Sequence, residues 1–261
     1  MFLRAVVIMD GLQLTIAVYL LMSTVDLIAA VIAFYIFFRL VKTFIKTGIL
    51  SIGLISFGFF LMFLSFTITS FFYSIASQQA WDMLGHMPEW MRRMHHTMPS
   101  YMARMMPMHW PLMVEASGAF PIPWFGLRVL LLSSYVLILA GYLLSRIDVS
   151  REQGPEEQGV ERGFVYAKSI PMIALLPYSS FLASVNLMSL AVLSLTVALL
   201  ATLYKKVKTA VILGFIALAL SHLIEIILVA EPSVTVLIVS ELLRPLAMFS
   251  IAVGVSNEGK E

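Results

Sequence analysis

Apolar residues dominate the chain in long runs that are separated by short polar stretches. A helix needs about 20 apolar residues to cross a bilayer core of about 30 Å, and six of these runs are long enough. They cover residues 12–40, 48–76, 124–145, 185–204, 207–229 and 234–255. Because backbone polar groups must be paired within the segment in lipid, such runs form helices. The pattern therefore predicts an all-α, polytopic membrane helix bundle.

A seventh run, residues 164–183, is less apolar because it contains Lys168, Pro171 and Pro177. Positive charge decides whether it crosses. If it does, three basic groups fall on one face, which is then cytoplasmic. These groups are Arg39, Lys42 and Lys46; Arg146, Arg151 and Arg162; and Lys205, Lys206 and Lys208. We therefore predict about seven transmembrane helices (range six to eight) in a cell membrane, with the N-terminus outside and the C-terminus cytoplasmic.

The rival topology adds an eighth helix at residues 5–22, and Asp10-Gly11 in the middle of that stretch argues against it. Residues 1–146 form the first half of the bundle and carry an external insert at 78–123, here called the Met/His segment. Residues 147–163 form a polar cytoplasmic linker, and 164–261 hold a linking helix and the second half.

The two halves resemble each other, which suggests a 3+1+3 internal repeat. Val25-Asp26-Leu27 corresponds to Val185-Asn186-Leu187 at an offset of 160, and Lys46-Thr47 corresponds to Lys208-Thr209 at an offset of 162. Leu127-Arg128 corresponds to Leu243-Arg244 at an offset of 116, and the drop in offset matches the length of the Met/His segment. Chance similarity between apolar helices is the alternative explanation.

Composition narrows the function classes. Hydrophobic residues make up 60% of the chain and charged residues 12%, with a net charge of +2, so lipid is the expected surrounding and nucleic acid is not an expected partner. The absence of cysteine excludes disulfides, thiolate zinc sites, iron–sulfur clusters and a cysteine nucleophile. The chain carries no GxSxG, HExxH or phosphate-binding loop. Only His222 lies in the spans, so neither a bis-histidine haem nor a nucleotide is indicated.

The Met/His segment holds ten of the 17 methionines and four of the five histidines. Methionines at 83, 87, 91, 94, 98, 102 and 105 would form one stripe on an α-helix, interrupted by three prolines. Thioethers select Cu(I), and imidazoles also bind copper. The candidate ligands are Met87, Met91, Met94, His95, His96, Met98, Met102, Met105 and His109.

The same segment also fits a purely structural role at the outer leaflet. Methionine packs against irregular partners, and Trp81, Trp90 and Trp110 are typical of the interfacial belt. A lipid-facing role does not need four histidines, however. The sequence leaves both interpretations open.

Ionisable residues inside the spans form a second candidate site, because charges in a membrane usually have a partner or a function. His222 and Glu225 share one helix face, and Glu241 and Arg244 share a face of the next helix. We expect Arg244 to pair with Glu241 or Glu225 and His222 to bridge them. In the first half, we expect Asp26 to pair with Arg128. These pairs either only fix helix register, or they line a polar cavity that is open to the outside and covered by the Met/His segment.

Two functions follow from these features. The first is copper binding, sensing or transfer at the outer face, with copper held by the Met/His segment. The second is a non-catalytic subunit of a membrane complex, for example a respiratory one, whose Met/His segment docks a protein partner. An enzymatic activity is the least expected of the three.

Overall fold

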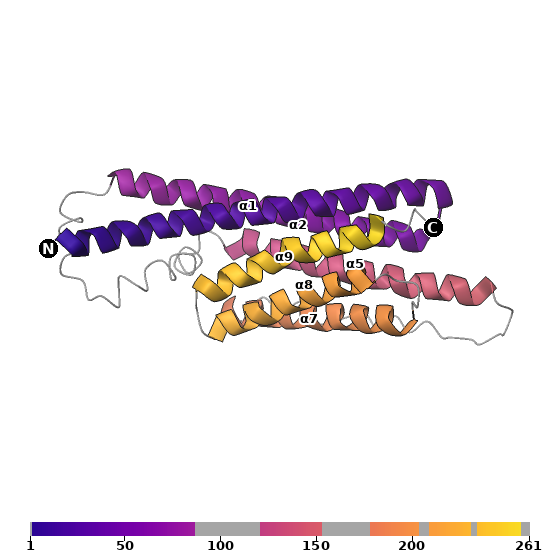
Figure 1. Cartoon of the computed structure of the whole chain (residues 1–261). Helices are drawn as coiled ribbons and strands as arrows, with labels where there is room; N and C mark the ends of the chain where they lie inside the picture. Colours follow the sequence, from indigo (N-terminus) through magenta and orange to yellow (C-terminus); the bar gives the residue numbers. More distant parts are fainter. Residues whose placement is uncertain (1, 87–120, 153–177, 204–208, 231–233, 257–261) are drawn as a thin grey trace.

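The chain is described by a computed structural model at residues 2–86, 121–152, 178–203, 209–230 and 234–256. These residues form six helices (Figure 1), and all six are long and apolar enough to cross a membrane. The predicted all-α, multi-span architecture is confirmed. The helices are α1 (Phe2–Thr47), α2 (Leu50–His86), α5 (Pro121–Glu152), α7 (Tyr178–Leu203), α8 (Thr209–Ala230) and α9 (Val234–Ser256).

Helices α1 and α2 form a long antiparallel hairpin. Gly48 closes it at a φ of 66°, and its amide donates to the Phe44 carbonyl at 2.7 Å, so the left-handed turn suits glycine. With 46 residues, α1 is about 69 Å long at 1.5 Å per residue, more than twice the bilayer core. It runs through Asp10-Gly11 without a break, so residues 5–22 belong to α1 and form no separate helix.

The helices group into two units of three, α1–α2–α5 (the first unit) and α7–α8–α9 (the second unit), which lie beside each other. Within each unit, successive helices run in opposite directions (Figure 1). Helices α1 and α9 run parallel, because Asp26 contacts Arg244 and the Tyr35 hydroxyl lies 3.0 Å from that of Ser256. The two units therefore have the same orientation.

This arrangement places the ends of α1, α5 and α7 at one end of the bundle (Figure 1). The basic residues near the ends of α1 and α5 are therefore at the same end of the bundle. The positive-inside rule requires such groups to share one side of the membrane. Helix α7 begins at the opposite end, near the start of α5. Of the predicted seventh span, 164–183, residues 164–177 lie outside the described residues. Its last six residues belong to α7, which begins at Tyr178.

The two units pack their last two helices in the same way. A Cβ on Gly58 would overlap the Ser134 carbonyl and Ile138 across the α2–α5 contact. A Cβ on Gly214 would overlap the Ala247 carbonyl and Ile251 across the α8–α9 contact. These glycines let the helix backbones approach closely, as small residues do in membrane bundles.

The burial pattern shows the same correspondence. Every buried position of α8 matches a buried position of α2 at an offset of 156, and those of α5 match α9 at 113. All five buried α7 positions from Val185 to Thr196 match buried positions of α1 at an offset of 160. Of the three sequence matches between the halves, the one at an offset of 160 agrees with the packing of α1 and α7. The match at 162 differs by six residues from the packing offset of α2 and α8, and the match at 116 differs by three residues from that of α5 and α9.

Candidate functional site

The two units meet at a buried group of charged and polar side chains. Asp26 comes from α1, Arg128 from α5, His222 and Glu225 from α8, and Glu241 and Arg244 from α9. We call these six residues the ionic cluster. Asp26, His222, Glu225, Glu241 and Arg244 are each at most 4% exposed. All six intramembrane residues selected from the sequence therefore lie in one place.

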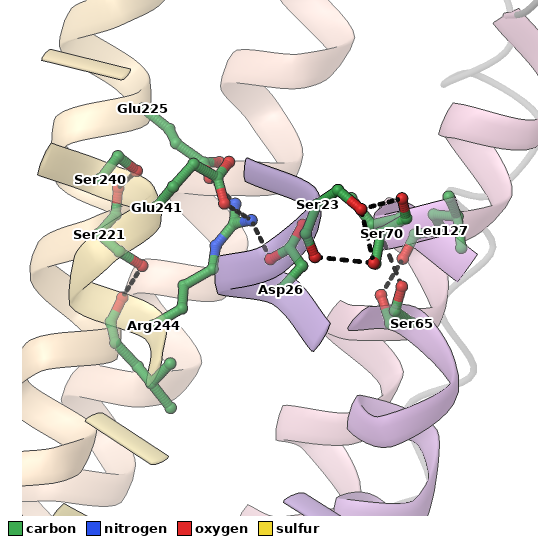
Figure 2. A network of polar contacts seen from close by, with 12 residues as sticks. Ser23, Asp26, Ser65, Ser70, Leu127, Ser221, Glu225, Ser240, Glu241 and Arg244 are labelled. Carbon is green, nitrogen blue, oxygen red and sulfur yellow. Dashed lines mark hydrogen bonds and ion pairs between the residues drawn. The ribbon is translucent and has the colours of Figure 1, made fainter. Parts of the chain in front are cut away.

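Arg244 is the centre of the cluster (Figure 2). Its Nη2 donates to Glu225 Oε1, and its Nη1 donates to Glu241 Oε2. The same Nη1 lies 3.5 Å from Asp26 Oδ1. One guanidinium group thus contacts three carboxyl groups from three helices. Its planar set of N–H donors allows this, whereas a lysine ammonium, with a single nitrogen, does not offer the same geometry. As expected, Arg244 pairs with both glutamates.

Arg128 forms the second contact between the units. Its Nη1 lies 2.8 Å from Glu225 Oε2, so the two oxygens of Glu225 each face a different arginine. The expected pair of Asp26 with Arg128 is therefore wrong: their ion pairs in the described structure are with Arg244 and Glu225. The prediction assumed that each half would satisfy its own charges, whereas the partners come from the opposite unit.

His222 is held by two neutral groups rather than by the expected bridge between charges. Its Nδ1 lies 3.0 Å from Asn186 Oδ1 and its Nε2 lies 3.0 Å from the Tyr135 hydroxyl. The Tyr135 and His222 rings also meet edge to face at 5.5 Å between centroids. Glu225 Oε2 is more distant, at 3.7 Å from Nδ1. His222 thus joins α5 of the first unit to α7 and α8 of the second.

Hydroxyl groups surround the ionic cluster and link the helices. Ser65 donates to the Leu127 carbonyl across α2–α5, and Ser240 donates to the Ser221 carbonyl across α8–α9. These bonds occupy corresponding places, because Ser65 and Ser221 are 156 residues apart and Leu127 and Ser240 are 113 apart. Ser23 and Ser70 exchange bonds between α1 and α2 (Figure 2).

A small cavity of about 10 Å³ lies beside the cluster. Ser65, Thr69, Arg128 and Arg244 provide its polar lining, together with Phe66, Leu127 and Leu131. That volume is close to the smallest that holds one water molecule, and the polar lining offers the partners such a water needs.

The cluster lies toward the end of the bundle at which α2 ends and α5 begins. Glu225 is five residues before the end of α8, and Arg128 is seven residues after the start of α5. At 1.5 Å per residue these distances are roughly 8 and 11 Å. The cluster thus lies toward the end of the bundle at which α2 leads into the Met/His segment and α5 follows it in the sequence.

The predicted metal ligands, Met87 to His109, all lie outside the described residues. Helix α2 extends to His86, so the first nine residues of the predicted insert continue that helix. Within the part of the chain that the structure describes, no three histidine, aspartate or glutamate side chains are arranged to hold a metal ion. The contacts that the structure shows within the ionic cluster are ion pairs and hydrogen bonds.

Sequence reasoning missed Tyr135 and Asn186 as members of the site. Tyr135 gives no charge signal, and it sits in a span where tyrosine is an ordinary packing residue. Asn186 did give a signal, because it matches Asp26 at the offset of 160. A buried amide needs partners as a carboxylate does, so this match could have placed it in the network.

The chain matches no protein-family model, no curated protein and no solved structure among those compared. Function must therefore be argued from the residues alone.

Proposed function

We propose that this chain is a membrane protein that binds copper(I) at its outer face through the Met/His segment. The observation that carries the proposal is the concentration of ten methionines and four histidines between two spans. Thioether ligands are soft and stay available in acid, where a thiolate would be protonated. The orientation that places the segment outside follows from the positive-inside rule and is part of the proposal.

The helices that flank the segment are joined close to the ionic cluster. Ser65 of α2 donates to the carbonyl of Leu127, six residues after the start of α5. The segment would therefore be attached to the bundle at the end where the ionic cluster lies. Duplication of a three-helix unit, with the segment inserted into the first copy, is the origin we propose for this arrangement. The common packing register of α2–α5 and α8–α9 supports it.

A second candidate is a subunit of a membrane complex that docks a partner at this end. Helices α1 and α2 project beyond the ends of α8 and α9 there (Figure 1). A paired extension of this kind offers a surface for a protein partner. Non-catalytic scaffolding is consistent with it.

Copper(I) titration of the purified full-length protein against a chromogenic chelator tests the first proposal. We expect at least one copper(I) per chain, lost when Met91, Met94, Met98 and Met102 are all replaced by leucine. Met188→Leu is the matched control, because Met188 lies on α7 and is 49% exposed. Metal-free protein that purifies in fixed ratio with another subunit would contradict copper binding and favour docking.

A further inference from the structure

The charges of the ionic cluster do not balance. Three carboxyl groups face two guanidinium groups, which leaves one negative charge if every acid is ionised. His222 has neutral hydrogen-bond partners, and the nearest carboxylate oxygen, Glu225 Oε2, lies 3.7 Å from Nδ1. In the neutral ring, Nδ1–H donates to Asn186 Oδ1 and Nε2 accepts from the Tyr135 hydroxyl, so both contacts form without a positive charge.

An uncompensated charge in the interior of a membrane bundle is costly. The simplest compensation is one proton held by one of the carboxyl groups. Glu225 is the least suited to hold it, because each of its oxygens already accepts from an arginine. Asp26 and Glu241 remain.

Asp26 and Glu241 meet each other beside Arg244. Asp26 is fully buried, and its Oδ2 receives no hydrogen bond from the described donors. Asp26 Oδ1 and Glu241 Oε2 both face the same nitrogen, Nη1 of Arg244. Two ionised carboxylates have only acceptors, so they can bond to each other only if one of them carries a hydrogen.

We propose that Asp26 and Glu241 form a proton-binding site in which the two carboxyl groups share one exchangeable proton between the two units. Arg244 of α9 and Arg128 of α5 face this pair, together with Tyr73 of α2, His222 and Glu225 of α8. The described part of α7 contributes Asn186, which does not titrate. The site is independent of the Met/His segment, so either proposal can fail alone.

A place for water lies beside Arg244, the residue that contacts both carboxyl groups. The cavity of about 10 Å³ has room for a single water between Arg244 and Arg128, and Arg128 is the most exposed member of the cluster at 17%. When the site empties, the O–H bond breaks and the proton passes to water, leaving a second carboxylate.

Infrared spectroscopy of the full chain in liposomes tests the site, because a protonated carboxyl group has a carbonyl band distinct from that of a carboxylate. We expect such a band at neutral pH, lost as the pH rises and shifted by ¹³C labelling of aspartate or of glutamate. Asp26→Asn and Glu241→Gln should each remove it. Glu152→Gln, at the end of α5 outside the cluster, should leave it unchanged.

The pH dependence of the free energy of unfolding is a second test, because a purely structural role of these residues would not produce it. Between the carboxyl pKa of the unfolded chain, about 4, and the pH at which the band is lost, the folded chain holds one more proton than the unfolded chain. The folding equilibrium constant should therefore fall about tenfold per pH unit as the pH rises, and this slope should vanish in Asp26→Asn. Absence of a protonated carboxyl band in the native chain, or a band that survives both substitutions, would overturn the proposal. A proton found on His222 instead would do the same.

Discussion

Replacing Arg244 by leucine removes the common partner of three buried carboxyl groups. Arg244 is 3% exposed, and its two terminal nitrogens bond Glu225 and Glu241 and approach Asp26. Removing one partner of a buried ion pair costs about 3–5 kcal/mol, since the other charge stays buried. The free energy of unfolding of a typical domain is about 5–15 kcal/mol. We therefore expect Arg244→Leu to lose about a fifth or more of the free energy of unfolding.

Two further variants separate charge from geometry. Arg244→Lys keeps the positive charge but cannot reach Glu225 and Glu241 from two separate nitrogens, so it should lose about 1.5–3 kcal/mol, the value of one hydrogen bond to a charged group. Adding Glu241→Gln to Arg244→Leu removes one stranded carboxylate and should recover part of the loss. Arg39→Leu is the control, because Arg39 donates to Tyr35 at an exposed site on α1, and we expect a change within about 0.5 kcal/mol.

Unfolding in mixed micelles of a mild detergent and dodecyl sulfate, followed by far-ultraviolet circular dichroism, measures these differences. Loss of less than about 1 kcal/mol in Arg244→Leu, or equal effects of Arg244→Leu and Arg39→Leu, would refute the view that Arg244 neutralises a buried acidic group.

Three other predictions concern separate parts of the molecule. Gly214→Ala should cost about 1–3 kcal/mol because its methyl group overlaps Ile251 and the Ala247 carbonyl, whereas Gly126→Ala, with open space around it, should be neutral or stabilising; equal unfolding curves would argue against close α8–α9 packing. Tyr135→Phe removes the hydroxyl partner of His222 Nε2 and should cost about 1–3 kcal/mol in the same assay, whereas Tyr35→Phe, at an exposed site, should change little. Copper(I) affinity of the full chain should change little between pH 7.5 and 5, because thioethers do not titrate while histidine does near pH 6.5; a steep loss in chelator titrations at pH 5 would assign the copper to histidine.

The helices could be predicted because lipid imposes a simple length rule on apolar runs. Runs such as 207–229 and 234–255 became α8 and α9 with shifts of only a few residues at either end. The full lengths of α1 and α2 could not be predicted in this way, since residues outside the hydrocarbon layer are not subject to the length rule. Helix α2 continues past the predicted run through Gln78 to His86.

The residues of the ionic cluster could also be predicted, because charge inside a span is a strong signal. Their pairing could not. Arg128 bonds Glu225 from the other unit, and no spacing along one helix contains that information. Tyr135 carries no signal of its own, because its role depends on His222 reaching it from α8.

The central claim is that buried ion pairs hold the two three-helix units together, and a double-mutant cycle between Arg128 and Glu225 tests it most directly. These side chains lie 2.8 Å apart and join α5 of the first unit to α8 of the second. Arg128→Met, Glu225→Gln and the double variant should show a coupling of about 1–3 kcal/mol in the free energy of unfolding. Effects that add to within about 0.5 kcal/mol would contradict the claim.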